Sequence, residues 1–244
     1  LDIGGDKQLS YFPIDDPNPF LGWRGIRISL DQPEIFQSQV RAMMRANEGL
    51  ENLRIMIPMI SDVSEVDEAL SIMKKIHADI LEEGIQVPMP EVGVMVEVPS
   101  AVYQAQALAQ RVDFLSVGSN DLTQYMLAVD RGNERIAYLY KELHPAVLRM
   151  IRLVIRSAHK CGAWVGLCGE MGGNPLATPV LLGLGLDEIS VSPVVLPEIK
   201  RIIRALSHEE AVRIADRALS MASANEIEEF MRRFIQKKFK SLSV

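Results

Sequence analysis

Short apolar runs alternate along this chain with amphipathic helical patterns, and this alternation constrains the fold more than any other feature. Each run is nearly continuous, which indicates a strand buried on both of its faces. Strands separated by helices predict a parallel sheet, because parallel neighbours need a long crossover connection. Ser64 is expected to cap the helix that follows the first strand. The predicted strands cover residues 53–60, 92–98, 113–118, 164–168 and 188–192.

Polar residues stand at the ends of these runs. Glu97 lies near the end of the second run, Asn120 and Asp121 follow the third, and Cys168 ends the fourth. Chemistry at the carboxyl ends of successive strands is typical of a (β/α)8 TIM barrel, and 244 residues is the usual size of one such domain. We therefore predict an α/β fold of TIM-barrel type, with a single domain over residues 1–244. A doubly wound sheet obeys the same rule and remains the alternative, although the chain has no GxGxxG fingerprint.

The composition is that of a globular protein with a substantial core, since 48% of the residues are hydrophobic and 24% are charged. The net charge of −6 argues against a nucleic-acid surface. No apolar run approaches the roughly 20 residues of a membrane span, and no signal peptide is evident. Cys161 and Cys168 make neither a disulfide framework nor a CxxC motif. We expect a cytoplasmic protein without nucleic-acid binding or membrane insertion.

The stretch after the third strand carries groups that suit an oxyanion and a hard divalent cation. The Asn120 amide can donate a hydrogen bond, the Asp121 carboxylate can ligate a cation, and Arg131 can form a forked contact with phosphate. The alternative is a loop whose Asn and Asp side chains only cap the next helix.

Glu97 interrupts an apolar strand, where an unpaired carboxylate is costly. Because consecutive strand ends meet at one rim, Glu97 and Asp121 are expected to face each other, and two carboxylates completed by substrate oxygens are a common magnesium arrangement. An ion pair between Glu97 and a neighbouring Arg or Lys stays open as the alternative. Arg24 follows Trp23 between two glycines, which suggests close backbone approach, although a Trp-Arg pair is commonly packing and surface charge alone.

Beyond these patterns, the chain resembles a known family from Asp2 to about residue 236. The motifs are similar to those of the C-terminal phosphoenolpyruvate-binding domain of phosphoenolpyruvate–protein phosphotransferase, enzyme I of the bacterial phosphotransferase system. Ser100 and Ala101 after Pro99 resemble the nitrogen-related paralogue more than the sugar enzyme. Pyruvate phosphate dikinase and phosphoenolpyruvate synthase share parts of these motifs and are the alternative. The motifs are NPFLGWRGIR (18–27), GVMVEVP (93–99), VGSNDLTQYMLAVDRGN (117–133), LHPAVLRMI (143–151) and GLCGEMGG (166–173).

The resemblance implies a domain that binds phosphoenolpyruvate with Mg²⁺. The phosphoryl group would pass to a histidine on a separate N-terminal domain and then to a phosphocarrier protein, with release of pyruvate. A homodimer is also implied. Without the resemblance, Cys168 would be interpreted as an inert strand cysteine. The roles implied for this sequence are magnesium ligands Glu97 and Asp121, substrate-binding residues Arg24, Asn120, Asp121 and Arg131, and the acid at the methylene carbon, Cys168.

The chain begins Leu1-Asp2-Ile3-Gly4-Gly5, which resembles the loop that leaves the family's third strand. We therefore expect a fragment of a larger multidomain enzyme with about five of the eight barrel strands. Residues 53–60 and 188–193 would then be unpaired sheet edges, which favour self-association or marginal stability. None of the four histidines stands in the context of a phosphoryl acceptor, so the fragment alone is expected to transfer nothing. A mainly dimerising or regulatory module is the competing class of function.

Overall fold

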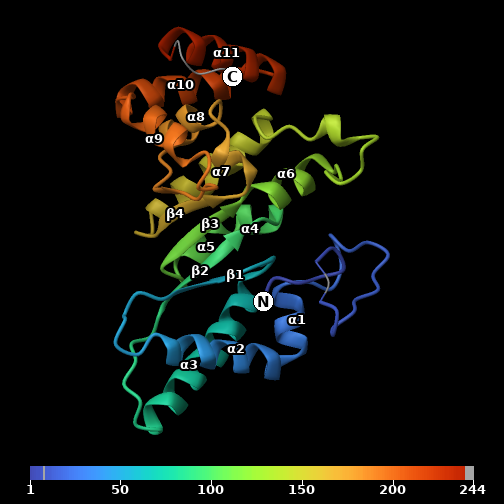
Figure 1. Ribbon diagram of the computed structural model, residues 1–244, viewed down its shortest axis with the longest axis vertical. Helices are drawn as coiled ribbons and strands as arrows, with labels where there is room; N and C mark the ends of the chain where they lie inside the picture. Colours follow the sequence, from blue (N-terminus) through green and yellow to red (C-terminus); the bar gives the residue numbers. More distant parts are fainter. Residues whose placement is uncertain (8, 240–244) are drawn as a thin grey trace.

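The computed structural model describes residues 1–7 and 9–239, and these residues form an α/β fold around one parallel sheet (Figure 1). The strands lie in the order β1-β2-β3-β4-β5, so β1 and β5 form the two edges, as the sequence predicted. Each neighbouring pair is parallel. The strands are β1 (Arg54–Ile57), β2 (Glu91–Val96), β3 (Phe114–Gly118), β4 (Trp164–Cys168) and β5 (Glu188–Ile189).

Helices connect the strands and cover the sheet. In Figure 1, α1, α2 and α3 lie on the β1 side, and α8 to α11 gather at the opposite end near the C-terminus. A β-carbon on Gly183 of α8 would lie 1.9 Å from the backbone oxygen of Ala211, so glycine is what lets α8 and α10 approach so closely. The helices are α1 (Ile26–Asp31), α2 (Pro33–Ala46), α3 (Val63–Glu82), α4 (Pro99–Tyr103), α5 (Ala105–Ala109), α6 (Ser119–Leu127), α7 (Pro145–His159), α8 (Thr178–Leu184), α9 (Leu196–Arg204), α10 (His208–Ser220) and α11 (Ala224–Lys238), with 3-10 turns η1 (Ala137–Leu139) and η2 (Glu170–Gly173).

Three strands are shorter than their apolar runs. β1 ends at Ile57, because Pro58 lacks an N–H for the ladder and Met59 adopts a left-handed φ of 59°. β2 ends at Val96, which leaves Glu97 just beyond the strand rather than within it. β5 covers two residues instead of the predicted 188–192.

The two faces of the sheet carry different side chains. Leu115 and Val117 of β3 belong to the main core that the helices close. On the other face, Phe114 stacks on Trp164 with ring centroids 4.5 Å apart, at the amino ends of β3 and β4. A β-carbon on Gly93 would lie 2.2 Å from the Phe114 ring, so the stack requires glycine at this position. This packing leaves the carboxyl ends of the strands for the polar side chains.

One prediction and one alternative about helix starts are wrong. The N-cap of α3 is Asp62 rather than Ser64, and Asp62 forms a capping box with Glu65. Asn120 and Asp121 do not form a capping loop either, because α6 begins at Ser119 and both lie in its first turn. Within the part of the chain that the structure describes, no helix is both long and apolar enough to cross a membrane.

Candidate functional site

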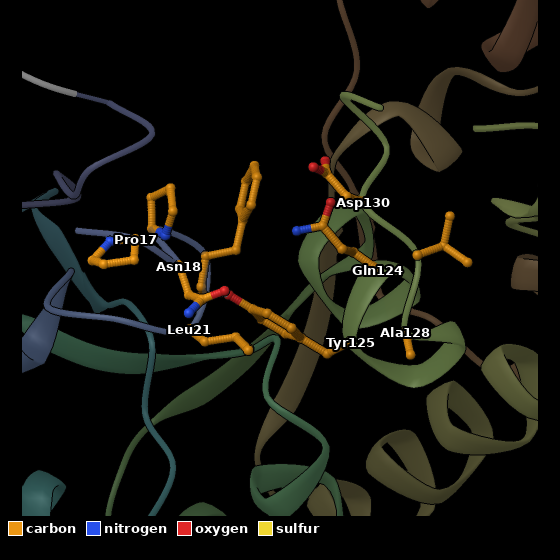
Figure 2. A pocket seen from close by; sticks show the side chains of 10 residues that line it. Pro17, Asn18, Leu21, Gln124, Tyr125, Ala128 and Asp130 are labelled. Atoms are coloured by element: carbon orange, nitrogen blue, oxygen red, sulfur yellow. The ribbon is translucent and has the colours of Figure 1, made fainter. Parts of the chain in front are cut away.

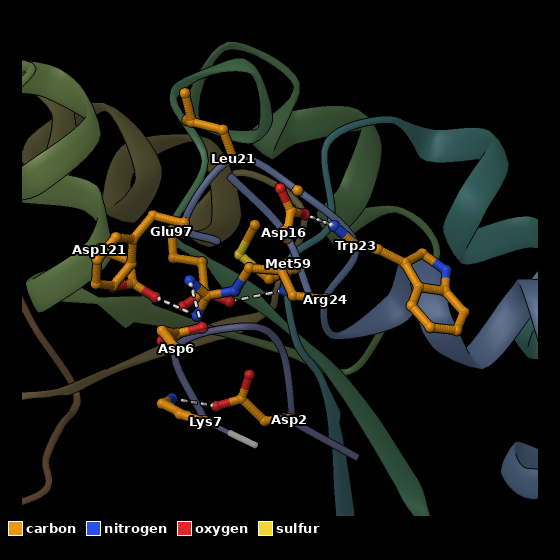
Figure 3. Close-up of polar contacts among 12 residues, drawn as sticks. Asp2, Asp6, Lys7, Asp16, Leu21, Trp23, Arg24, Met59, Glu97 and Asp121 are labelled. Carbon is orange, nitrogen blue, oxygen red and sulfur yellow. Dashed lines mark hydrogen bonds and ion pairs between the residues drawn. The ribbon is translucent and has the colours of Figure 1, made fainter. Parts of the chain in front are cut away.

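Glu97 is held by groups from both neighbouring strands. It is 4% exposed, and its Oε1 accepts a hydrogen bond of 2.7 Å from the backbone N–H of Met59, beyond the end of β1 (Figure 3). On the other side, a β-carbon on Gly118 at the end of β3 would lie 2.9 Å from Glu97 Oε2. The glycine therefore makes room for the carboxylate.

Burial raises the pKa of the Glu97 carboxyl to about 8, above its ordinary value of 4.5. The hydrogen bond from Met59 opposes this rise, and the negative charge of Asp121 adds to it. The carboxyl group is thus largely protonated at neutral pH when no metal ion is bound, even with the Arg24 guanidinium in the same cluster. A bound divalent cation favours the carboxylate instead, because it supplies the missing positive charge.

Arg24 lies at the centre of a buried charge cluster (Figure 3). Its side chain is 1% exposed, and its Nη2 lies 3.0 Å from Asp121 Oδ2. Its Nη1 lies 3.5 Å from both Asp6 Oδ1 and the Tyr125 hydroxyl. Its Nε has no hydrogen-bond partner among the described residues, which leaves one donor of the guanidinium available. An anion that contacts Arg24 through its Nη atoms must displace one of these partners.

A cavity of about 400 Å³ lies beside this cluster (Figure 2). Its walls are the loop 17–21 and the C-terminal half of α6 with the turn that follows. The Tyr125 hydroxyl donates to the backbone oxygen of Phe20 and so ties the two walls together. Burial raises the pKa of Tyr125 to about 12, which keeps this donor protonated. The cavity lies between the loop that leads to Arg24 and the turn that leads to Arg131.

Asn120 and Arg131 are connected through Glu170. Asn120 Oδ1 accepts a hydrogen bond of 3.0 Å from the backbone N–H of Glu170, and Arg131 Nη1 lies 3.4 Å from Glu170 Oε1. The Arg131 and Glu170 side chains are 33% and 76% exposed, so their ion pair contributes at most about 1 kcal/mol. An incoming anion can displace Glu170 from Arg131 far more easily than it can displace the buried partners of Arg24.

Cys168 ends β4 opposite Gly118 of β3. Its Sγ lies 3.8 Å from the Ser116 hydroxyl and 3.6 Å from the backbone oxygen of Val117. Burial raises the pKa of the Cys168 thiol above its usual value, although the hydrogen bond from Ser116 opposes the rise. The thiol therefore keeps its proton at neutral pH.

Glu97 and Asp121 suit a hard cation such as Mg²⁺. Both are more than nine-tenths buried, and Glu97 has a pKa that a nearby positive charge would return toward normal. In the described ranges, no group of three or more His, Cys, Asp or Glu side chains is arranged to hold a metal. Two protein carboxylates with the other oxygens from ligand and water is an arrangement that Mg²⁺ accepts. The residues present therefore fit magnesium as a two-carboxylate site.

The structure brings the predicted site residues together in three groups. Arg24, Asp121 and Glu97 form the buried cluster. Asn120 and Arg131 are linked at the rim through Glu170, and Cys168 directly precedes Gly169 and Glu170. All six therefore lie at the carboxyl ends of β2, β3 and β4 or in the segments beside them.

Several residues with a part in this geometry were not predicted from the sequence. Asp6 pairs with Arg24, and its only signal is a place after Gly4-Gly5. Gln124 and Tyr125 stand inside the central motif, where their spacing from Asp121 puts them on the next turn of the same helix. Met59 acts through its backbone N–H, so its side-chain type gives no indication of the role.

A parallel α/β sheet with its ionisable groups at the carboxyl ends of neighbouring strands is the arrangement of TIM-barrel-type domains, and doubly wound domains share it. The chain belongs to the PEP-utilising enzyme family: its residues 1–208 match the family model described as "PEP-utilising enzyme, PEP-binding domain". The family predicted from the sequence motifs is thereby confirmed.

Curated relatives give a finer comparison. The chain is 46% identical over 239 residues to a Salmonella typhimurium protein named "Phosphoenolpyruvate-dependent phosphotransferase system", covering 98% of this chain and 32% of the relative. It is 48% identical over 237 residues to "Phosphoenolpyruvate-protein phosphotransferase" from Haemophilus influenzae, covering 96% and 41%. The Bacillus subtilis protein of that name is 47% identical over 234 residues, covering 95% and 41%. The chain thus spans about a third to two fifths of the length of these relatives.

Solved structures support the fold class alone. A citrate lyase from Burkholderia xenovorans superposes with a TM-score of 0.51 at 16% identity, covering 85% of this chain and 70% of that one. A malate synthase from Haloferax volcanii gives a TM-score of 0.52 at 16% identity, covering 83% and 57%. The predicted α/β fold of TIM-barrel type is confirmed.

Proposed function

We propose that this chain is the phosphoenolpyruvate-binding domain of a phosphoenolpyruvate–protein phosphotransferase, as a single domain over residues 1–244. The observation that carries the proposal is the buried cluster of Arg24, Asp121 and Glu97 at the carboxyl ends of neighbouring strands. The names of the relatives support the same activity. The parent polypeptide would be a transferase, and this chain would hold its phosphoryl donor.

The roles proposed for the side chains follow from their chemistry. Arg131, Arg24 and Asn120 would contact the phosphate, because forked guanidinium groups neutralise phosphoryl oxygens. Glu97 and Asp121 would hold Mg²⁺, which supplies further positive charge to those oxygens. Asp121 is shared in this arrangement, since it also pairs with Arg24. The site is thus built to bind and orient a small anion that carries a phosphate group.

Cys168 would supply the proton that completes the reaction. As the phosphorus–oxygen bond breaks, the phosphoryl group passes to the acceptor nitrogen and leaves the enolate of pyruvate. The Cys168 thiol, protonated because burial raises its pKa, gives its proton to the methylene carbon of the enolate and becomes a thiolate. The product is pyruvate.

The phosphoryl acceptor would be a histidine outside this chain. The four histidines here have other contacts or places. His77 lies against the backbone oxygen of Val87, His144 caps α7, His159 pairs with Asp187, and His208 begins α10. The acceptor histidine would then phosphorylate a phosphocarrier protein. We also propose a homodimer in the cytoplasm, and favour the nitrogen-related paralogue over the sugar enzyme.

Calorimetric titration of phosphoenolpyruvate with and without Mg²⁺ tests this proposal. We expect binding that strengthens with Mg²⁺ and a loss of that strengthening in the double variant Glu97→Ala, Asp121→Ala. Glu209→Gln, an exposed carboxylate change on α10, is the matched control and should bind as the parent does. Binding that is insensitive to both Mg²⁺ and the double variant would refute the metal site. The alternative, a pyruvate phosphate dikinase or phosphoenolpyruvate synthase, is distinguished by the parent polypeptide: such an enzyme would not need a phosphocarrier protein to accept the phosphoryl group.

A further inference from the structure

Helix α6 carries site residues in its first turn, and it also contacts the turn 128–131 that follows it. Asn120 and Asp121 lie in its first turn. The helix stops at Ala128, whose φ of 52° is left-handed, and the chain then turns back. A left-handed residue other than glycine persists only when surrounding contacts fix it. The backbone conformation from Ala128 to Arg131 therefore depends on the contacts between this turn and α6.

The Gln124 side chain provides that contact. Gln124 is 4% exposed, and its Oε1 accepts a hydrogen bond of 3.0 Å from the backbone N–H of Arg131. The backbone oxygen of Gln124 also accepts from the N–H of Val129 at 3.1 Å. The side-chain and backbone oxygens of Gln124 thus hold the backbone N–H groups of Arg131 and Val129, two positions of the turn.

The contact between Gln124 and Arg131 completes a closed series of contacts that runs through Glu170 and Asn120. Arg131 Nη1 reaches Glu170, the Glu170 backbone N–H donates to Asn120, and Asn120 lies one helical turn before Gln124 on α6. Among the described residues, the guanidinium of Arg131 is held only by the exposed Glu170 carboxylate, whereas its backbone N–H is held by the buried Gln124 amide. The lasting constraint on Arg131 therefore comes from Gln124, because a ligand can displace Glu170.

We propose that Gln124 is the positioning residue for Arg131: its buried amide oxygen fixes the backbone from which Arg131 reaches the ligand phosphate. The inference rests on the proposed role of Arg131 at that phosphate. Gln124 itself need not touch the ligand, and its effect on binding passes through Arg131.

A double-variant comparison tests this positioning role. In the full chain, Gln124→Met keeps the side-chain length but removes the acceptor, and we expect phosphoenolpyruvate with Mg²⁺ to bind about three- to tenfold more weakly by calorimetry, the effect of one hydrogen bond. In an Arg131→Ala background, the same change should cause no further loss, since the residue that Gln124 positions is gone. Gln37→Met, an exposed change on α2, is the control and should leave binding unchanged.

The outcomes separate the two proposals. If Arg131→Ala weakens binding and Gln124→Met either has no effect or acts equally in both backgrounds, the positioning role is overturned while the proposed function stands. If Arg131→Ala binds as the parent does, the role of Arg131 fails and the inference fails with it. Amide hydrogen exchange in the unmodified chain gives a measurement that does not depend on variants folding. Protection of the Arg131 amide supports the contact, and exchange at the rate of an open turn overturns it.

Discussion

The backbone N–H of Met59 donates a hydrogen bond of 2.7 Å to Oε1 of Glu97. Met59 follows β1 and Glu97 follows β2, so the bond joins the carboxyl ends of two adjacent parallel strands. The bond stabilises the carboxylate, yet the pKa of Glu97 still rises to about 8 because burial outweighs it. The folded protein therefore holds a carboxyl group that would ionise near pH 4.5 in the unfolded chain. This difference links protonation to stability.

The first prediction concerns the pH dependence of stability without a metal. Because the folded state retains a proton that the unfolded state loses above about pH 4.5, Glu97 lowers the free energy of unfolding as the pH rises toward 8. The limiting slope is about 1.4 kcal/mol per pH unit. Glu97→Gln keeps the acceptor for Met59 without this titration, so the variant should become increasingly more stable than the parent between pH 5 and 8. Urea denaturation at several pH values measures the difference.

Glu209→Gln on α10 provides the control for this experiment, because its carboxylate is exposed. Adding Mg²⁺ at pH 8 should stabilise the parent and not Glu97→Gln, since a ligand stabilises only the state that binds it. A stability difference between parent and Glu97→Gln that does not change with pH would contradict the raised pKa.

The second prediction concerns the glycine beside Glu97. In Gly118→Ala, the new methyl carbon would lie 2.8 Å from Glu97 Cβ and 2.9 Å from its Oε2, so the carboxylate must move. We expect a loss of Mg²⁺-dependent phosphoenolpyruvate binding of about tenfold or more, consistent with a displaced ligand group. Gly166→Ala on β4 is the matched control, since its nearest neighbours are at 3.4 Å or beyond. Calorimetry compares the two variants, and equal binding would show that Glu97 tolerates the displacement.

Much of the fold could be predicted from the sequence because buried parallel strands have continuous apolar runs. β3 and β4 begin and end within one residue of the predicted ranges, 113–118 and 164–168. The run 53–60 overextends β1, because residues beyond Ile57 stay apolar and buried after they leave the strand. Apolar composition indicates burial, and the end of hydrogen bonding depends on Pro58 and on the backbone of Met59.

The site was only partly predictable, for a physical reason. Glu97 and Asp121 could be found because buried carboxylates are unusual in apolar surroundings. The partner of Arg24 at the N-terminus, Asp6, is far from them in sequence and gives no periodic signal. Contacts made by the backbone, such as that of Met59, leave no trace in residue type.

The third prediction concerns the hydroxyl that joins the loop of Arg24 to α6. Tyr125→Phe removes the donor to the backbone oxygen of Phe20 and a contact with Arg24. We expect a loss of about 1–2 kcal/mol in the free energy of unfolding, because a partly buried acceptor loses its partner. Tyr103→Phe, at a side chain 77% exposed, should change stability by less than about 0.5 kcal/mol. Equal denaturation midpoints for the two variants would show that the loop 17–21 is held by other contacts.

The last prediction separates binding from proton transfer. Cys168→Ala, made in a polypeptide that also carries the acceptor histidine, should bind phosphoenolpyruvate within about twofold of the parent, because the thiol makes its contribution after the ligand is seated. Pyruvate formation should fall by about a hundredfold or more, the usual effect of losing a general acid. Cys161→Ala is the matched control, since its thiol contacts the backbone of Gln106 rather than the strand ends. Calorimetry gives the affinity and a coupled assay gives the pyruvate. Unchanged pyruvate formation in Cys168→Ala would leave the thiol a packing role beside Ser116, with the proton coming from another group.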